Sequence, residues 1–105
     1  MRRLTVDAYV LETLMADLVG HDRHPSAFLV YLYLWARTAG SRSRRRRVAL
    51  SHQRMAEDTG LSKSAVQSAV RALVRRRLLR AERASRTAVP EYFVLRPWMR
   101  TEERR

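Results

Sequence analysis

The stretch from Met55 to Val70 constrains the fold of this chain more than any other part of it. Two short helical patterns meet there at Thr59-Gly60-Leu61, and a turn of this length joins two helices that pack at a steep angle. Gly60 suits the left-handed backbone that ends a helix, where a Cβ is disfavoured. Ser62 is suited to cap the next helix by accepting a hydrogen bond from a free backbone N–H. The sequence therefore predicts two short helices with a tight turn between them.

The second of these helices, residues 62–77, has two chemically different faces. Apolar residues recur at helical spacing on one side, at Val66, Ala69, Val70 and Leu73. The other side carries polar and basic residues, namely Lys63, Ser64, Gln67, Ser68 and Arg71. Such side chains hydrogen-bond to phosphates or to the edges of bases. We expect the apolar side to face a core and the polar side to face a nucleic acid.

Net charge divides the chain into two parts. Residues 1–40 contain four arginines and four acidic residues and are neutral overall, whereas residues 41–105 hold the other 18 basic residues and six acids and carry the whole charge of +12. A basic part attached to a neutral part is typical of a polyanion-binding surface on a scaffold, although a solvated basic face would look the same. We favour nucleic acid because the basic part also contains the helical pair.

Composition excludes several classes of protein. The 105 residues suffice for one core and include no cysteine, so disulfides and thiolate metal sites are absent. The start of the chain lacks the pattern of a signal peptide, and its longest apolar run, residues 27–36, is about half of the ~20 residues that span a membrane. We expect a cytoplasmic, nucleoid-associated protein with no membrane contact.

Two more helices are expected before the helical pair. The first runs from about Thr5 to Val19 with Thr5 as its cap, and the second from about Pro25 to Thr38. The inward face of the first helix is formed by Val6, Val10, Leu14 and Leu18, with Leu11 and Met15 beside it. The second helix is apolar nearly all round, which predicts that it is the central core helix.

The remaining segments predict a loop and three strands. Residues 41–47 contain five arginines and no apolar residue, which is typical of a flexible loop. Residues 48–50 are a short strand candidate, and Ser51 caps a helix at about His52 to Thr59. Residues 78–84 and 91–96 show strand patterns on either side of a turn-forming segment, residues 85–90, and so predict a β-hairpin.

This arrangement resembles the bacterial winged helix-turn-helix regulators, in particular small, arginine-rich, single-domain members. The resemblance covers about residues 26–98. It depends on Leu50-Ser51, Met55-Ala56, Thr59 to Ser64, Val66-Gln67, Leu73 to Leu79 and Val89 to Tyr92. It implies a mainly α fold with a small β-hairpin wing: about four helices, a short first strand and a two-stranded wing.

The resemblance also divides the chain and assigns its parts. Residues 1–24 are then an N-terminal helix and candidate dimerisation element, residues 25–98 the DNA-binding domain, and residues 99–105 a charged tail. The family commonly has glycine just before the wing, where this chain has Arg77. Arg77 must therefore adopt a costly left-handed conformation or a different turn.

The resemblance implies that helix 62–77 lies in the major groove and that wing 79–96 contacts the flanking backbone or minor groove. Base-reading candidates share one helical face: Ser64, Gln67, Ser68 and Arg71. Backbone candidates are Ser62, Lys63, Arg54, Arg44, Arg45, Arg46, Arg47, Arg83, Ser85 and Arg86. A regulator usually pairs two such domains, and we expect a homodimer through the first helix, Trp98 and Met99.

The sequence gives no sign of catalysis, since it lacks a phosphate-binding glycine loop and the spacing of metal ligands. We therefore expect no enzyme activity, no cofactor, no metal and no small-molecule effector. Two other functions stay open. A replication initiator or replisome organiser would use the same fold on DNA, and a winged-helix protein-interaction module would have lost DNA binding.

Overall fold

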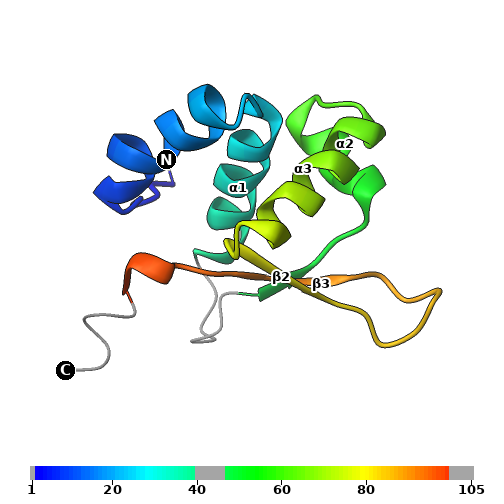
Figure 1. Cartoon of the computed structure of the whole chain (residues 1–105). Helices are drawn as coiled ribbons and strands as arrows, with labels where there is room; N and C mark the ends of the chain where they lie inside the picture. Colours follow the sequence, from blue (N-terminus) through cyan, green and yellow to red (C-terminus); the bar gives the residue numbers. More distant parts are fainter. Residues whose placement is uncertain (1, 40–46, 100–105) are drawn as a thin grey trace.

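The computed structural model describes residues 2–39 and 47–99, and its centre is helix α1 (Pro25–Thr38). Tyr31, Leu34 and Trp35 are completely or almost completely buried on α1. Figure 1 shows α1 between the N-terminal helical segment on one side and two further helices on the other. Both the bounds and the central position that the sequence predicts for this helix are confirmed.

The described residues form a mainly helical structure with a small antiparallel sheet. Helices α2 (His52–Thr59) and α3 (Lys63–Arg75) pack against each other and on α1. Strands β1 (Arg47–Ala49), β2 (Leu79–Glu82) and β3 (Glu91–Val94) make a sheet in the order β1-β3-β2. The sheet lies below the helices in Figure 1, and the β2–β3 hairpin extends beyond them. A short 3₁₀ helix, η3 (Pro97–Met99), follows.

The N-terminal helical segment differs from the prediction. It consists of two π-helical stretches, η1 (Val10–Leu14) and η2 (Ala16–His21), and the helix does not begin at Thr5. The predicted start and cap are wrong because the Thr5 carbonyl accepts a hydrogen bond from Trp35 Nε1 at 2.9 Å. This contact ties the non-helical residues at the start of the described chain to α1.

One face of the N-terminal helical segment is buried as predicted, with Val10, Leu14 and Leu18 in the core. Their spacing of four residues keeps them close to one line in the wide turns of a π-helix. A second row with the same spacing faces outward, because Leu11, Met15 and Val19 are 51, 42 and 39% exposed. We call these three residues the apolar stripe.

Caps and turns form largely where the sequence places them. Ser51 Oγ accepts from Arg54 N at 3.0 Å, and Ser62 Oγ accepts from Ala65 N at 3.1 Å. Gly60 ends α2 with φ of 81°, in the left-handed region. The cap of α1 was not predicted: Ala27 N donates to His24 Nδ1 at 3.3 Å.

The sheet has a core face and an outer face. Leu79, Tyr92 and Val94 point into the main core. In the register, Arg47, Phe93 and Arg80 stand opposite one another across the three strands and so share the outer face. The Arg80 guanidinium covers the Phe93 ring, 4.2 Å from its centroid, which explains how an aromatic ring on this face is buried.

The two ends of the described chain meet in an aromatic stack. The Trp98 ring lies between those of Tyr9 and Trp35, with centroid distances of 4.6 and 6.5 Å. Trp98 Nε1 donates to Asp7 Oδ2 at 3.0 Å. Trp98 therefore packs within its own chain, and the apolar stripe is a separate exposed apolar surface on the N-terminal helical segment. Across residues 2–39 and 47–99, every helix is too short or too polar to cross a bilayer.

Candidate nucleic-acid interface

Helix α3 presents the polar face that its sequence predicts. Its apolar side is buried against α1 and α2, with Val66, Ala69 and Leu73 fully enclosed. On its other side Lys63 and Arg71 are exposed, and Gln67 is partly exposed. The helix is thus held rigidly by one face while cationic and amide groups stand on the other.

The beginning of α3 is ordered by two serines. Ser62 Oγ, besides capping the helix, lies 3.3 Å from Ser64 Oγ. Ser64 is exposed, and its hydroxyl lies beside the first free N–H groups of α3. Hydroxyls and N–H groups at a helix start are suited to a phosphate oxygen.

Ser68 has a contact that the sequence does not reveal. His24 Nε2 lies 3.1 Å from Ser68 Oγ. Because His24 Nδ1 accepts the hydrogen bond that caps α1, the proton of the neutral ring lies on Nε2, which then donates to Ser68. The Ser68 hydroxyl is therefore directed to the start of α1.

The β2–β3 hairpin contributes a basic group next to α3. Arg83 follows β2, and its Nη1 donates to the Arg86 carbonyl at 3.2 Å. Ser85 Oγ accepts from Ala88 N at 3.2 Å and so stabilises the turn at the tip. Arg83, Ser85 and Arg86 are all exposed.

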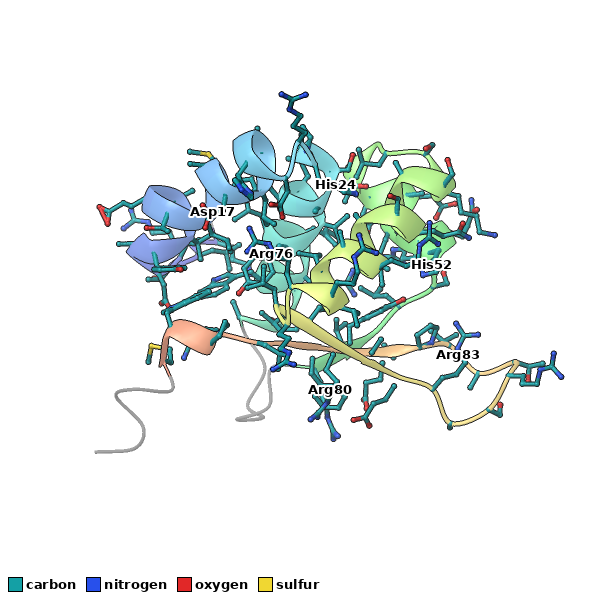
Figure 2. The ribbon with its side chains drawn as sticks, in the orientation of Figure 1. Asp17, His24, His52, Arg76, Arg80 and Arg83 are labelled. Carbon is teal, nitrogen blue, oxygen red and sulfur yellow. The ribbon has the colours of Figure 1, made fainter. Side chains whose placement is uncertain are left out.

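His52 brings these elements together, and sequence reasoning missed it. It is the first residue of α2 and is partly exposed. Burial, followed by the positive charges of Arg83, Lys63 and Arg71, lowers the pKa of His52 below its ordinary value of 6.5. The hairpin and both ends of the polar face of α3 therefore act on one imidazole. Figure 2 shows His52 and Arg83 on the same side of the molecule. We call these four residues the cationic cluster.

The sequence does contain one indication of His52: it is a polar residue in the first turn of the helix that precedes α3. The sequence does not show which charges surround it, since its three cationic neighbours lie 11 to 31 positions away along the chain. Only the packing of α2, α3 and the hairpin makes it central.

Arg54, another backbone candidate, belongs to a network between α1 and α2. Its Nε donates to Asp58 Oδ2 at 3.0 Å, and the same oxygen accepts from the Tyr33 hydroxyl and from Arg37 Nη1. The hydrogen bonds from Tyr33 and Arg54 lower the pKa of Asp58. Arg54 remains exposed, but a carboxylate already compensates its charge.

Of the backbone candidates in the arginine-rich segment, Arg47 is the first residue of β1. Arg47 lies on the outer face of the sheet, with its Nε 3.8 Å from Glu91 Oε2, and so is not brought to the cationic cluster. The other loop candidates, Arg44, Arg45 and Arg46, lie outside the described residues.

A second link ties α3 to the segment before α1. Arg76 Nε donates to Asp22 Oδ2 at 2.8 Å, and Arg76 Nη2 donates to Asp22 Oδ1 at 3.2 Å. Hydrogen bonds from His21 and then Arg76 lower the pKa of Asp22. Together with the His24–Ser68 contact, this forked ion pair holds residues 22–24 along α3. We call the two contacts the clasp.

Within residues 2–39 and 47–99, no group of three or more histidine or acidic side chains is placed to hold a metal ion. No protein-family model, curated protein or solved structure matches this chain.

Proposed function

We propose that this chain is a sequence-specific double-stranded DNA-binding protein of the winged helix-turn-helix class and acts as a transcriptional regulator. The observation that carries the proposal is the polar and cationic face of α3, on which Lys63 and Arg71 are exposed, together with the exposed Arg83 of the hairpin. Cations from two separate elements on one side of the molecule suit a duplex, whose phosphates approach from more than one direction.

The interface divides into positioning and reading groups. Ser62, Lys63, Arg83 and Arg86 contact phosphates and fix the register of the protein on the duplex. Gln67, Ser64 and Arg71 face the major groove, where glutamine pairs with adenine and arginine with guanine, each good pair discriminating by about 1–3 kcal/mol. Ser68 contributes indirectly, because its contact with His24 helps to hold α3 in place beside the reading groups.

A second copy of the chain would contact the other half of a DNA operator. One helix covers only a few base pairs, and two-fold operators match dimers with two such helices. The apolar stripe of Leu11, Met15 and Val19 is the surface that we assign to the second copy, since it is exposed and lies in the neutral part of the chain.

The test is selection of duplexes from a randomised pool, followed by fluorescence anisotropy over a salt series. We expect an enriched motif and a slope of log K against log salt of about −5 if about six phosphates are neutralised. Gln67→Ala changes the motif at one position. Arg83→Ala leaves the motif intact and reduces the slope by about one. Arg3→Ala, an exposed arginine in the neutral part, serves as the matched charge control and leaves both unchanged.

Two results contradict the proposal in different ways. Salt-steep binding without an enriched motif contradicts operator reading and favours the replication role. Absence of binding at low salt contradicts DNA binding altogether and favours the protein-interaction module.

A further inference from the structure

The turn that precedes α1 lies along α3 and is held there at two points. Arg76 donates to both carboxylate oxygens of Asp22, at 2.8 and 3.2 Å. His24 Nε2 lies 3.1 Å from Ser68 Oγ. The residue between these two anchors is Arg23, which therefore has a fixed place beside α3.

Arg23 has a left-handed backbone, with a φ of 53°. A non-glycine residue seldom adopts this conformation, and it persists where the surrounding structure imposes it. The main chain on both sides of Arg23 is also fixed, since Asp22 N donates to the Asp17 carbonyl and His24 N to the Leu18 carbonyl, both at 2.8 Å. The turn thus holds Arg23 in one backbone conformation, with its side chain exposed.

The charge of Arg23 is uncompensated. Among residues 2–39 and 47–99, no carboxylate forms an ion pair with its guanidinium, and the adjacent carboxylate of Asp22 is bound to Arg76. An exposed guanidinium without a protein partner is suited to a phosphate, on which it can place two parallel hydrogen bonds.

Arg23 and the hairpin lie on different sides of α3. In Figure 2, His24, the neighbour of Arg23, lies near the top of the view and Arg83 lies at the lower right, with α3 between them. A helix in the major groove, which is about 12 Å wide, has a phosphate backbone on each side. The hairpin is suited to one of these backbones and the turn to the other.

We propose that Arg23 is a second phosphate-binding point, which contacts the DNA backbone on the side of α3 away from the hairpin. This inference depends on the proposed function and adds to its interface a residue from the neutral part of the chain.

The first experiment is anisotropy over a salt series, with the selected duplex and with a duplex of random sequence. We expect Arg23→Gln to weaken binding to both by roughly five- to tenfold at ~0.1 M salt and to reduce the salt slope by about one, without changing the selected motif. Arg23→Lys keeps the charge and restores most of the affinity. Arg3→Gln, the control from the same part of the chain, binds like the wild type.

A further variant separates binding from folding. Arg23→Gly removes the guanidinium and suits the left-handed backbone, so it is expected to lose the same affinity with no fall in the temperature of thermal unfolding.

The second experiment locates the contact, using duplexes in which single phosphates are replaced by neutral methylphosphonates. One replacement is expected to weaken binding of the wild type and to leave that of Arg23→Gln unchanged. The replacement to which Arg83→Ala is insensitive should lie on the other side of the groove.

The outcomes separate the two proposals. If wild type, Arg23→Gln and Arg23→Gly bind DNA with the same affinity and salt slope, or if Arg23 and Arg83 depend on the same phosphate, the inference is overturned and DNA binding stands. If no duplex binds at low salt, the proposed function fails and the inference fails with it.

Discussion

At the scale of single residues, Arg77 is one of two non-glycine residues in the described chain with a left-handed backbone, the other being Arg23. The φ of Arg77, 58°, lies in the left-handed region, which non-glycine residues seldom adopt. The chain reverses there, because Arg77 N donates to the Val74 carbonyl and Leu78 N to the Leu73 carbonyl, both at 3.0 Å. Leu78 and Leu79 are buried directly afterwards. Their burial offsets the conformational cost and holds β2 under α3.

Replacing Arg77 with glycine is expected to stabilise the protein by about 0.5 kcal/mol, the relief of left-handed strain less the extra entropy of glycine in the unfolded chain. Gly60→Ala is the matched opposite. No heavy atom lies within 4 Å of an added Cβ at Gly60, so its expected loss of about 1 kcal/mol is conformational. Urea unfolding measures both. A loss of stability in Arg77→Gly contradicts the strain argument.

The structural roles of some single residues could be predicted from the sequence, and those of others could not. Ser51, Gly60 and Ser62 were predictable because caps and helix ends depend on neighbours within a few residues. His24 and Ser68 were not, since they meet across 44 positions and histidine is an uncommon cap. Lys63, Arg71 and Arg83 are candidates that the sequence offers, whereas His52 is not, because its neighbours depend on tertiary packing.

At the scale of elements, the clasp fixes the direction of α3. The forked ion pair of Asp22 and Arg76 holds the end of α3, and His24 holds its middle through Ser68. Because α3 also packs on α1 and α2, the helix is supported along most of its length. The exposed face that adjoins these supports is the one that we assign to DNA.

The clasp makes a pH-dependent contribution to stability. The pKa of Asp22 is lowered in the folded state, so its contribution is present above the unfolded value of 3.8 and is lost as the pH falls through and below that value. Asp22→Asn is expected to be less stable than wild type at neutral pH by less than about 1 kcal/mol, as for exposed ion pairs. The difference should vanish in acid. Asp17→Asn is the control, and thermal unfolding from neutral to acidic pH is the measurement.

The sequence predicts some of the helices and strands more accurately than others. The sequence predicts α1, α2 and the hairpin correctly, because the apolar periodicity and the turn residues that define them are local. The N-terminal helical segment begins later than predicted, because the side chain of Trp35 binds the Thr5 carbonyl. Its π-helical geometry has no local signal that distinguishes it from an α-helix with the same apolar spacing. The outer face of the sheet was also unpredicted, since its row of Arg47, Phe93 and Arg80 depends on register.

At the scale of the whole molecule, charge and apolar surface are separated. The charge of +12 belongs to residues 41–105, so two copies repel each other through that part and approach best through residues 1–40. The apolar stripe lies in the neutral part. The separation leaves the cationic cluster free for a polyanion in the proposed dimer.

Sedimentation equilibrium is expected to show a dimer for the wild type and a monomer for Met15→Lys, because a lysine in the centre of the apolar stripe brings two like charges together. Met15 is 42% exposed, so the substitution should leave the fold intact. Thr13→Lys, exposed on the same helix but outside the stripe, keeps the dimer and controls for added charge. Equal masses for wild type and Met15→Lys contradict the assignment of this surface.

The aromatic stack has a spectroscopic consequence. Trp35 and Trp98 are the two tryptophans of the chain, and their rings lie 6.5 Å apart with an interplanar angle of 14°. Tryptophan fluorescence therefore depends on the surroundings of this one stack, where the two ends of the described chain meet. It is insensitive to changes in the hairpin. Near-ultraviolet circular dichroism should show the coupled absorption of two neighbouring indoles. If this signal and the far-ultraviolet helix signal disappear together on heating, the termini and α3 belong to one cooperative unit.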